Sequence, residues 1–77
     1  MKDDYMIIHQ RVTRSAVEDL CDRINTGKPS ELTENAFTMF NWAVEQIEHG
    51  RVILSSDPTG SDIKELSMPI FDRIKVN

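Results

Sequence analysis

Residues 6–20 read MIIHQRVTRSAVEDL, and the pattern of side chains changes halfway along this stretch. Up to Val12, β-branched and polar residues are mixed as in a short extended segment. From Ser15 onward, apolar residues return every three or four positions, which is the period of a helix that buries one face. The stretch therefore predicts a strand, Met6–Val12, that leads directly into a helix, with Arg11 and Arg14 beside the junction.

The composition is that of one small globular domain, with 39% hydrophobic and 29% charged residues in 77. A chain of this length buries only about 60% of the surface that it exposes when unfolded, so it gains much from a partner. No apolar run approaches the ~20 residues of a membrane span. The opening MKDDY is acidic where a signal peptide is basic, and a lone cysteine excludes an internal disulfide framework. We expect a cytoplasmic protein without membrane contact.

The net charge of −4 resides in the second part of the chain. Residues 1–30 carry five basic and five acidic side chains, whereas residues 31–77 carry four and eight. The acidic balance counts against an extended nucleic-acid groove. The neutral first part still leaves its bases free to gather on one face.

Two helices are expected after the strand. Thr13 is the expected N-cap of the first helix, and Gly27 is expected in the left-handed position after its end. Pro29 disfavours direct continuation, so Ser30 is expected to cap a second helix that closes at Gly50. The first helix has an apolar stripe of Val17, Leu20, Cys21 and Ile24. The second has a wider apolar face, formed by Leu32, Ala36, Phe37, Met39, Phe40, Trp42, Ala43, Val44 and Ile47.

The tail has the pattern of a β-hairpin. Residues 51–55 and 63–68 are strand candidates, and Pro69 stops the second one. Between them, Asp57-Pro58-Thr59-Gly60 has the residues of a type I turn. The element order is β-α-α-β-β, an α+β protein with residues 1–50 as the core and residues 51–77 as a hairpin extension.

No residue pattern in the sequence indicates catalysis, a metal or a cofactor. Cys21 lies inside an apolar stripe, where a small core residue is the ordinary interpretation. His9 and His49 lack other ligands at metal-binding spacing, and the loop at residues 57–62 lacks the ligand set of a calcium site. The chain is expected not to be an enzyme.

A solitary strand leaves backbone donors and acceptors unpaired, so it needs a neighbour. One solution is the same strand of a second copy, paired antiparallel about a two-fold axis. Such a ribbon fits the major groove of DNA. His9 and Arg11 share one of its faces because strand side chains alternate. Arg14 and Lys28, at its margins, are expected to contact phosphates.

This arrangement resembles the ribbon–helix–helix repressors, the Arc and methionine-repressor superfamily. The matching residues are Arg11–Leu20 for the Arg-apolar-Pro start and first helix, and Gly27–Leu32 with Ala36-Phe37 for the turn and second helix. The likeness covers about residues 5–50. It implies a homodimer that binds double-stranded DNA sequence-specifically, as a transcriptional repressor or an antitoxin-like regulator.

The resemblance also implies the contact residues. Base contacts fall on Ile7, His9 and Arg11, and a phosphate contact falls on Ser30 with Glu31. The chain departs from the family at Gln10, where an apolar residue is usual, at Ile7, where a polar one is usual, and at Thr13, where proline is frequent. A register slipped by one residue would face Gln10 outward but would bury Arg11 at high cost. We therefore expect Arg11 to face outward.

A competing fold needs no second chain. Residues 6–12 pair in it with the hairpin as a three-stranded sheet, and the protein is a small interaction or structural module that does not bind DNA. In the dimer, the hairpin instead covers the helices or binds a protein partner such as a toxin.

Overall fold

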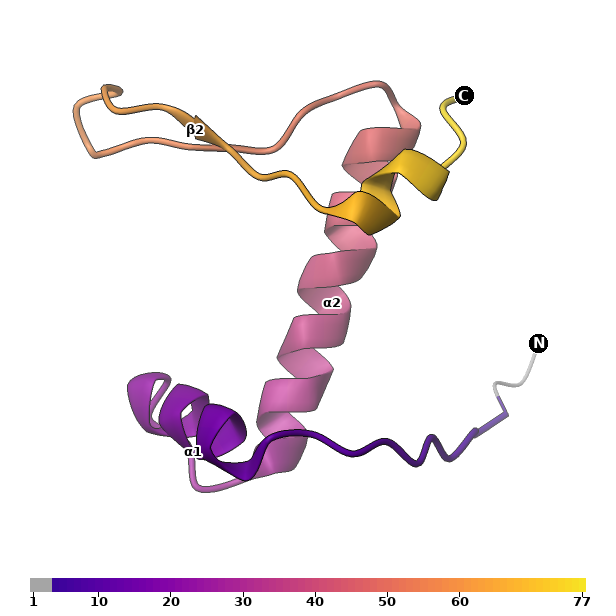
Figure 1. Ribbon diagram of the computed structural model, residues 1–77, viewed down its shortest axis with the longest axis vertical. Helices are drawn as coiled ribbons and strands as arrows, with labels where there is room; N and C mark the ends of the chain where they lie inside the picture. The colour runs from indigo at the N-terminus through magenta and orange to yellow at the C-terminus, as the bar shows by residue number, and fades with distance from the viewer. Residues whose placement is uncertain (1–3) are drawn as a thin grey trace. The chain divides into compact units, whose positions relative to one another are not determined.

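The computed structural model describes residues 4–77 (Figure 1). Its elements are the helices α1 (Arg14–Arg23) and α2 (Pro29–Glu48), the strands β1 (Leu54–Ser55) and β2 (Lys64–Glu65), and a 3₁₀ helix, η1 (Pro69–Arg73). The protein is thus α+β, with a two-stranded antiparallel sheet. The chain divides into two compact units, Met1–Thr33 and Glu34–Asn77.

In the first unit, α1 begins and ends for local reasons. Thr13 occupies the predicted N-cap position with extended backbone, although its side chain makes no capping hydrogen bond. At the other end, Asn25 takes the left-handed conformation with φ 60°. The Asn25 N–H donates to the Asp22 carbonyl at 3.1 Å and the Thr26 N–H to the Cys21 carbonyl at 2.9 Å. This pair of bonds is a Schellman motif.

The prediction that Gly27 takes the left-handed position is wrong. The helix ends two residues earlier than the glycine requires, with Ile24 as its C-cap. Asparagine tolerates positive φ better than most residues because its short polar side chain can bond locally. Asn25 therefore takes the left-handed position after the helix that was expected for Gly27.

The helix α2 begins at Pro29, so the prediction of Ser30 as its N-cap is also wrong. Proline suits the first position of a helix, because its missing N–H would have no partner inside the helix there. The connection before it is tied down by Thr26. Its hydroxyl donates to the Glu31 carboxylate and accepts the Lys28 N–H at 3.1 Å.

In the second unit, the end of α2 follows the prediction. Gly50 has φ 73°, and its N–H donates to the Ile47 carbonyl at 2.9 Å while the Arg51 N–H donates to the Gln46 carbonyl at 3.0 Å. Gly50 thus closes a second Schellman motif. The Asn77 N–H donates to the Glu48 carbonyl at 2.7 Å, which brings the last residue of the chain to the end of the same helix.

The hairpin pairs Leu54 with Glu65 and Ser55 with Lys64. The Leu66 N–H adds a bond of 2.8 Å to the Ile53 carbonyl. Both strands are shorter than the predicted ranges 51–55 and 63–68. The predicted turn is confirmed, since the Gly60 N–H donates to the Asp57 carbonyl at 2.9 Å, the bond that closes a β-turn.

The predicted strand Met6–Val12 is not formed within one chain. Residues 4–12 have no regular secondary structure, and the sheet of the described residues contains β1 and β2 alone. The competing three-stranded sheet is therefore not the fold of this chain. A strand is defined by the ladder with its neighbour, and a single copy offers this segment none.

Little of the apolar surface is buried. Among the described residues, the buried apolar side chains are Cys21 and Ala43, at 7% and 5% exposure. Cys21 is thus a core residue of the first unit, as predicted. In the second unit, η1 lies beside the last turns of α2 (Figure 1), and the rings of Phe40 and Phe71 stack with centroids 6.5 Å apart.

Candidate nucleic-acid interface

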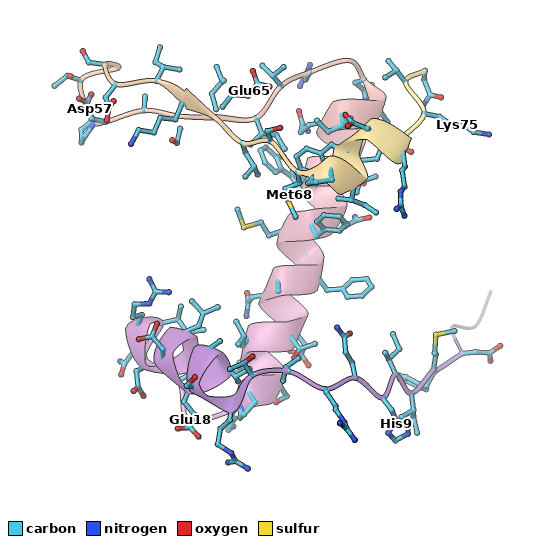
Figure 2. All side chains as sticks on the ribbon, viewed as in Figure 1. His9, Glu18, Asp57, Glu65, Met68 and Lys75 are labelled. Carbon is cyan, nitrogen blue, oxygen red and sulfur yellow. The ribbon has the colours of Figure 1, made fainter. Side chains whose placement is uncertain are left out.

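The candidate base-reading residues lie on the segment that precedes α1. Ile7, His9 and Arg11 occupy alternate positions of residues 4–12, all of which are exposed. Figure 2 shows the His9 side chain projecting from this segment. Its apolar residues are exposed on both sides of the alternation, with Ile7 at 82% and Ile8 at 68%. One chain therefore covers neither face of the segment.

Arg11 is available for an external ligand. It makes no hydrogen bond or ion pair within residues 4–77. Arginine is the side chain that most often reads guanine, because its guanidinium donates two hydrogen bonds to O6 and N7. The segment thus carries an unpaired guanidinium between the uncharged side chains of Gln10 and Val12.

The starts of the two helices meet at one hollow of the first unit. A hollow of about 400 Å³ is lined by Val12, Arg14, Val17, Glu18 and Pro29. It brings Arg14, a predicted phosphate contact, to the beginning of α2, where Lys28 and Ser30 flank Pro29. Of the predicted phosphate contacts, Arg14 is the one that lines this hollow.

Arg14 is only weakly held there. Its Nη1 lies 3.6 Å from Glu18 Oε1, and the two side chains are 90% and 62% exposed. An exposed pair one helical turn apart contributes about 0.3–0.5 kcal/mol. The guanidinium can thus exchange this carboxylate for a phosphate at little cost.

Glu31 is the least available of the predicted phosphate contacts. Its N–H donates to the Lys28 carbonyl at 3.0 Å, and its carboxylate accepts the Thr26 hydroxyl. A carboxylate also repels a phosphate. Sequence reasoning missed Thr26, whose contact spans five residues and matches no recognised capping pattern.

The loop at residues 57–62 uses its carboxylate for its own structure. Asp57 Oδ1 accepts the Thr59 hydroxyl at 2.7 Å, the Thr59 N–H at 3.0 Å and the Ser61 N–H at 2.8 Å. The Thr59 hydroxyl above all, together with the Ser61 N–H, lowers the pKa of Asp57 below its usual 3.8. In the described part of the chain, no three His, Cys, Asp or Glu residues are grouped to hold a metal ion.

The second unit carries an apolar cavity of about 220 Å³ between α2, the end of the hairpin and η1. Met68, labelled in Figure 2, is one of its lining residues. The others are Ala36, Met39, Phe40, Ala43, Leu66 and Phe71. The lining is therefore apolar throughout.

Comparison of the chain with protein-family models, with curated proteins and with solved structures finds no match. No helix within residues 4–77 combines the length and apolarity needed to cross a membrane.

Proposed function

We propose that the protein is a homodimeric DNA-binding protein of the ribbon–helix–helix class. Two copies pair residues 6–12 as antiparallel strands, and the resulting ribbon enters the major groove. The observation that carries the proposal is the segment itself, which has no strand partner within the described chain, is exposed on both faces and is joined directly to α1. Such a segment needs a second strand for its backbone groups and a cover for one face.

The surface of the chain supports a second copy. Large apolar side chains are exposed in both units, among them Val12 at 65%, Ile24 at 46% and Trp42 at 49%. Obligate dimers bury ~2,000–5,000 Å² of mostly apolar surface counted over both chains, so a dimer of this kind would cover about 1,000–2,500 Å² of each chain.

The ribbon has two chemically different faces. Met6, Ile8, Gln10 and Val12 lie on the side that packs against the helices, and Ile7, His9 and Arg11 lie on the side that meets DNA. Arg11 reads a guanine in each half-site, and His9 supports it. Arg14, Lys28 and the first N–H groups of α2, from Ser30 onward, hold the phosphates on either side.

In this proposal, binding to DNA is enough to regulate transcription. A dimer that occupies an operator sequence-specifically acts as a repressor or an antitoxin-like regulator without catalysing a reaction. The acidic second half of the chain, with eight acids and four bases after residue 30, weakens non-specific attraction to DNA.

One observation favours a second candidate function, that of a protein-interaction module without DNA binding. The apolar cavity beside Met68 and Phe71 offers a place for a partner's side chain. In the proposed dimer, the same cavity gives the second unit a role in binding a protein.

Selection from random duplexes at low salt, followed by binding titrations, tests the proposal. We expect Arg11→Ala to lower affinity and to relax discrimination at one base pair per half-site by about 1–3 kcal/mol. Its melting temperature should stay nearly unchanged because Arg11 is exposed and unpaired. Arg14→Ala and Lys28→Ala should weaken all sequences alike and reduce the salt slope by about 1 each.

Arg73→Ala is the matched control, since Arg73 is exposed but lies in η1. It should bind like the unmodified protein. If the selection enriches no sequence, and Arg11→Ala and Arg73→Ala bind DNA equally, the protein does not read DNA through this segment.

A further inference from the structure

We propose that the second unit binds an extended segment of another protein at the free edge of β2, and that this segment places one large apolar side chain in the neighbouring cavity. The segment carries basic residues on either side of its apolar one. The inference deepens the second candidate function, and it needs neither the paired ribbon nor DNA binding. It is carried by the backbone of β2, the apolar cavity and the charge of the second unit.

One edge of β2 has backbone groups without partners. The sheet of the described residues contains two strands, so each strand has one free edge. The Leu66 N–H donates to the Ile53 carbonyl at 2.8 Å and thus points towards β1. Because successive backbone groups of a strand point to opposite sides, the N–H groups of Glu65 and Ser67 point to the free edge. Ser67 makes no hydrogen bond in the described part of the chain.

A free edge of this kind is a template for a further strand. An extended segment that pairs there gains main-chain hydrogen bonds, and pockets beside the edge select its side chains. Leu66 and Met68, on either side of Ser67, both line the apolar cavity. Figure 2 labels Glu65 on the strand and Met68 at the cavity. A strand added at this edge therefore runs beside the cavity.

The cavity has room for one large side chain. Its volume is about 220 Å³, whereas pockets for small molecules measure about 300–1,000 Å³. An apolar cavity of about 150 Å³ already holds a benzene molecule, so an aromatic side chain fits. Every lining residue is apolar, which excludes a charged side chain because its burial would leave it without partners.

The walls of the cavity favour an aromatic ring. Phe40 and Phe71, whose ring centroids are 6.5 Å apart in a stacked arrangement, belong to the lining together with Met39 and Met68. Aromatic rings pack favourably against each other and against methionine sulfur. Met39 is 65% exposed and Met68 is 40% exposed, so these flexible side chains are free to close over a ring that enters.

The charge of the second unit selects a basic partner. Residues 34–77 carry seven acidic and four basic side chains, a net charge of −3. The basic residue next to the edge, Lys64, has its Nζ 3.9 Å from Asp62 Oδ2. The Glu65 carboxylate forms no ion pair in the described chain. A basic segment is therefore attracted to this edge, whereas the same acidic unit of a second copy is repelled.

Three peptides with blocked ends test the proposal on the full, unmodified chain. The probe is KTVFVTK, and its controls are KTVAVTK, which lacks the ring, and ETVFVTE, which carries acids in place of the bases. We expect KTVFVTK to bind. Loss of the ring should lower the affinity at least about tenfold, since no large apolar side chain is then buried. ETVFVTE should bind more weakly at low salt, and its difference from KTVFVTK should shrink as salt is added.

NMR spectra locate the bound peptide. Binding of KTVFVTK should shift the methyl signals of Met39 and Met68, because the ring lies against them. It should also slow hydrogen exchange of the Glu65 and Ser67 N–H groups, because they become paired. Shifts that fall instead on residues 6–12 contradict this site.

Two variants test the cavity and the edge separately. Ala36→Leu reduces the cavity from an exposed part of its wall, and Ser67→Pro removes one donor from the edge. Each should weaken the binding of KTVFVTK severalfold, whereas Ala16→Leu, at an exposed alanine of α1, should bind it like the unmodified chain.

The outcomes separate this inference from the DNA-binding proposal. Failure of KTVFVTK to bind at millimolar concentration, or equal binding of the three peptides, overturns the inference and leaves DNA binding untouched. If the methyl signals of Met39 and Met68 shift with protein concentration in the absence of peptide, the cavity is instead a contact between copies. If no operator is selected but KTVFVTK binds as expected, the site stands and the DNA-binding proposal falls.

Discussion

Asp57 and Arg11 are both charged and exposed, yet the fold uses only one of them. The Asp57 carboxylate accepts hydrogen bonds from Thr59 and Ser61 and so closes its own loop. Arg11 contacts no polar group in the described chain. A charged side chain that stabilises nothing locally can be replaced without loss of stability, which is why Arg11→Ala is a clean test of function.

The same comparison predicts a pH dependence for the loop. Because the pKa of Asp57 is lowered below 3.8 in the folded chain, its carboxylate stabilises the loop at neutral pH. That contribution is lost as the pH falls through the lowered pKa, where the folded carboxyl takes up its proton. We expect the amide signals of Thr59 and Ser61 to shift with that titration in NMR spectra.

Asp57→Asn is the matched control for this titration. Its amide oxygen can still accept hydrogen bonds, but the side chain does not ionise, so the two amide signals should stop responding to acid. A titration in the unmodified protein centred above 3.8 would contradict the stabilising role of the carboxylate.

At the scale of the elements, the features that the sequence predicted correctly are those that depend on residues adjacent in the chain. Gly50 and the turn at Asp57–Gly60 end or reverse the chain where expected, because each acts through its own backbone. Pro69 begins η1, and β2 already ends at Glu65. Two predictions failed by a short distance at the connection between the helices. Asn25 and Gly27 both tolerate a left-handed conformation, and both Pro29 and Ser30 suit a helix start, so local preference did not decide between them.

The predicted strand Met6–Val12 does not form in a single chain, and the reason is different. A strand exists only in a ladder, and pairing is a property of two segments. The alternation of residues 7, 9 and 11 predicts which side chains share one face of the segment. It does not predict the strand with which the segment pairs. The same holds for the candidate site. The sequence identifies Arg11 in one chain, and the matching Arg11 belongs to the proposed second copy.

The glycines give a matched test of the helix ends. Gly50 has φ 73°, whereas Gly27 lies outside the left-handed region and has open space where a Cβ would stand. We expect Gly50→Ala to destabilise the fold by about 1–2 kcal/mol, because a Cβ is strained at that conformation. Gly27→Ala should be neutral or stabilising by up to about 1 kcal/mol, since it restricts the unfolded chain.

Thermal or urea unfolding of the two variants checks this prediction. The Val76 Cγ1 lies 3.7 Å from the position of a Cβ at Gly50, an ordinary contact, so backbone strain is the cause being measured. Equal stability of the two variants would contradict the assignment of the helix end to Gly50.

At the scale of the whole molecule, one copy buries few of its apolar side chains. Cys21 and Ala43 are the buried apolar residues of the described chain, while Phe37, at 72%, and Met39, at 65%, face solvent from α2. A small chain with so little core needs a second source of burial. In the proposed dimer, pairing of residues 6–12 with a second copy would supply this burial and would form the proposed DNA-reading face.

The solution mass tests this account most directly. Light scattering of the full chain at micromolar concentration should report twice the 8.9 kDa of one copy. Unfolding should then depend on protein concentration, because the dimer is the folded species. A folded particle of 8.9 kDa, with a melting temperature that does not change with concentration, would contradict the paired ribbon and the DNA-binding function built on it.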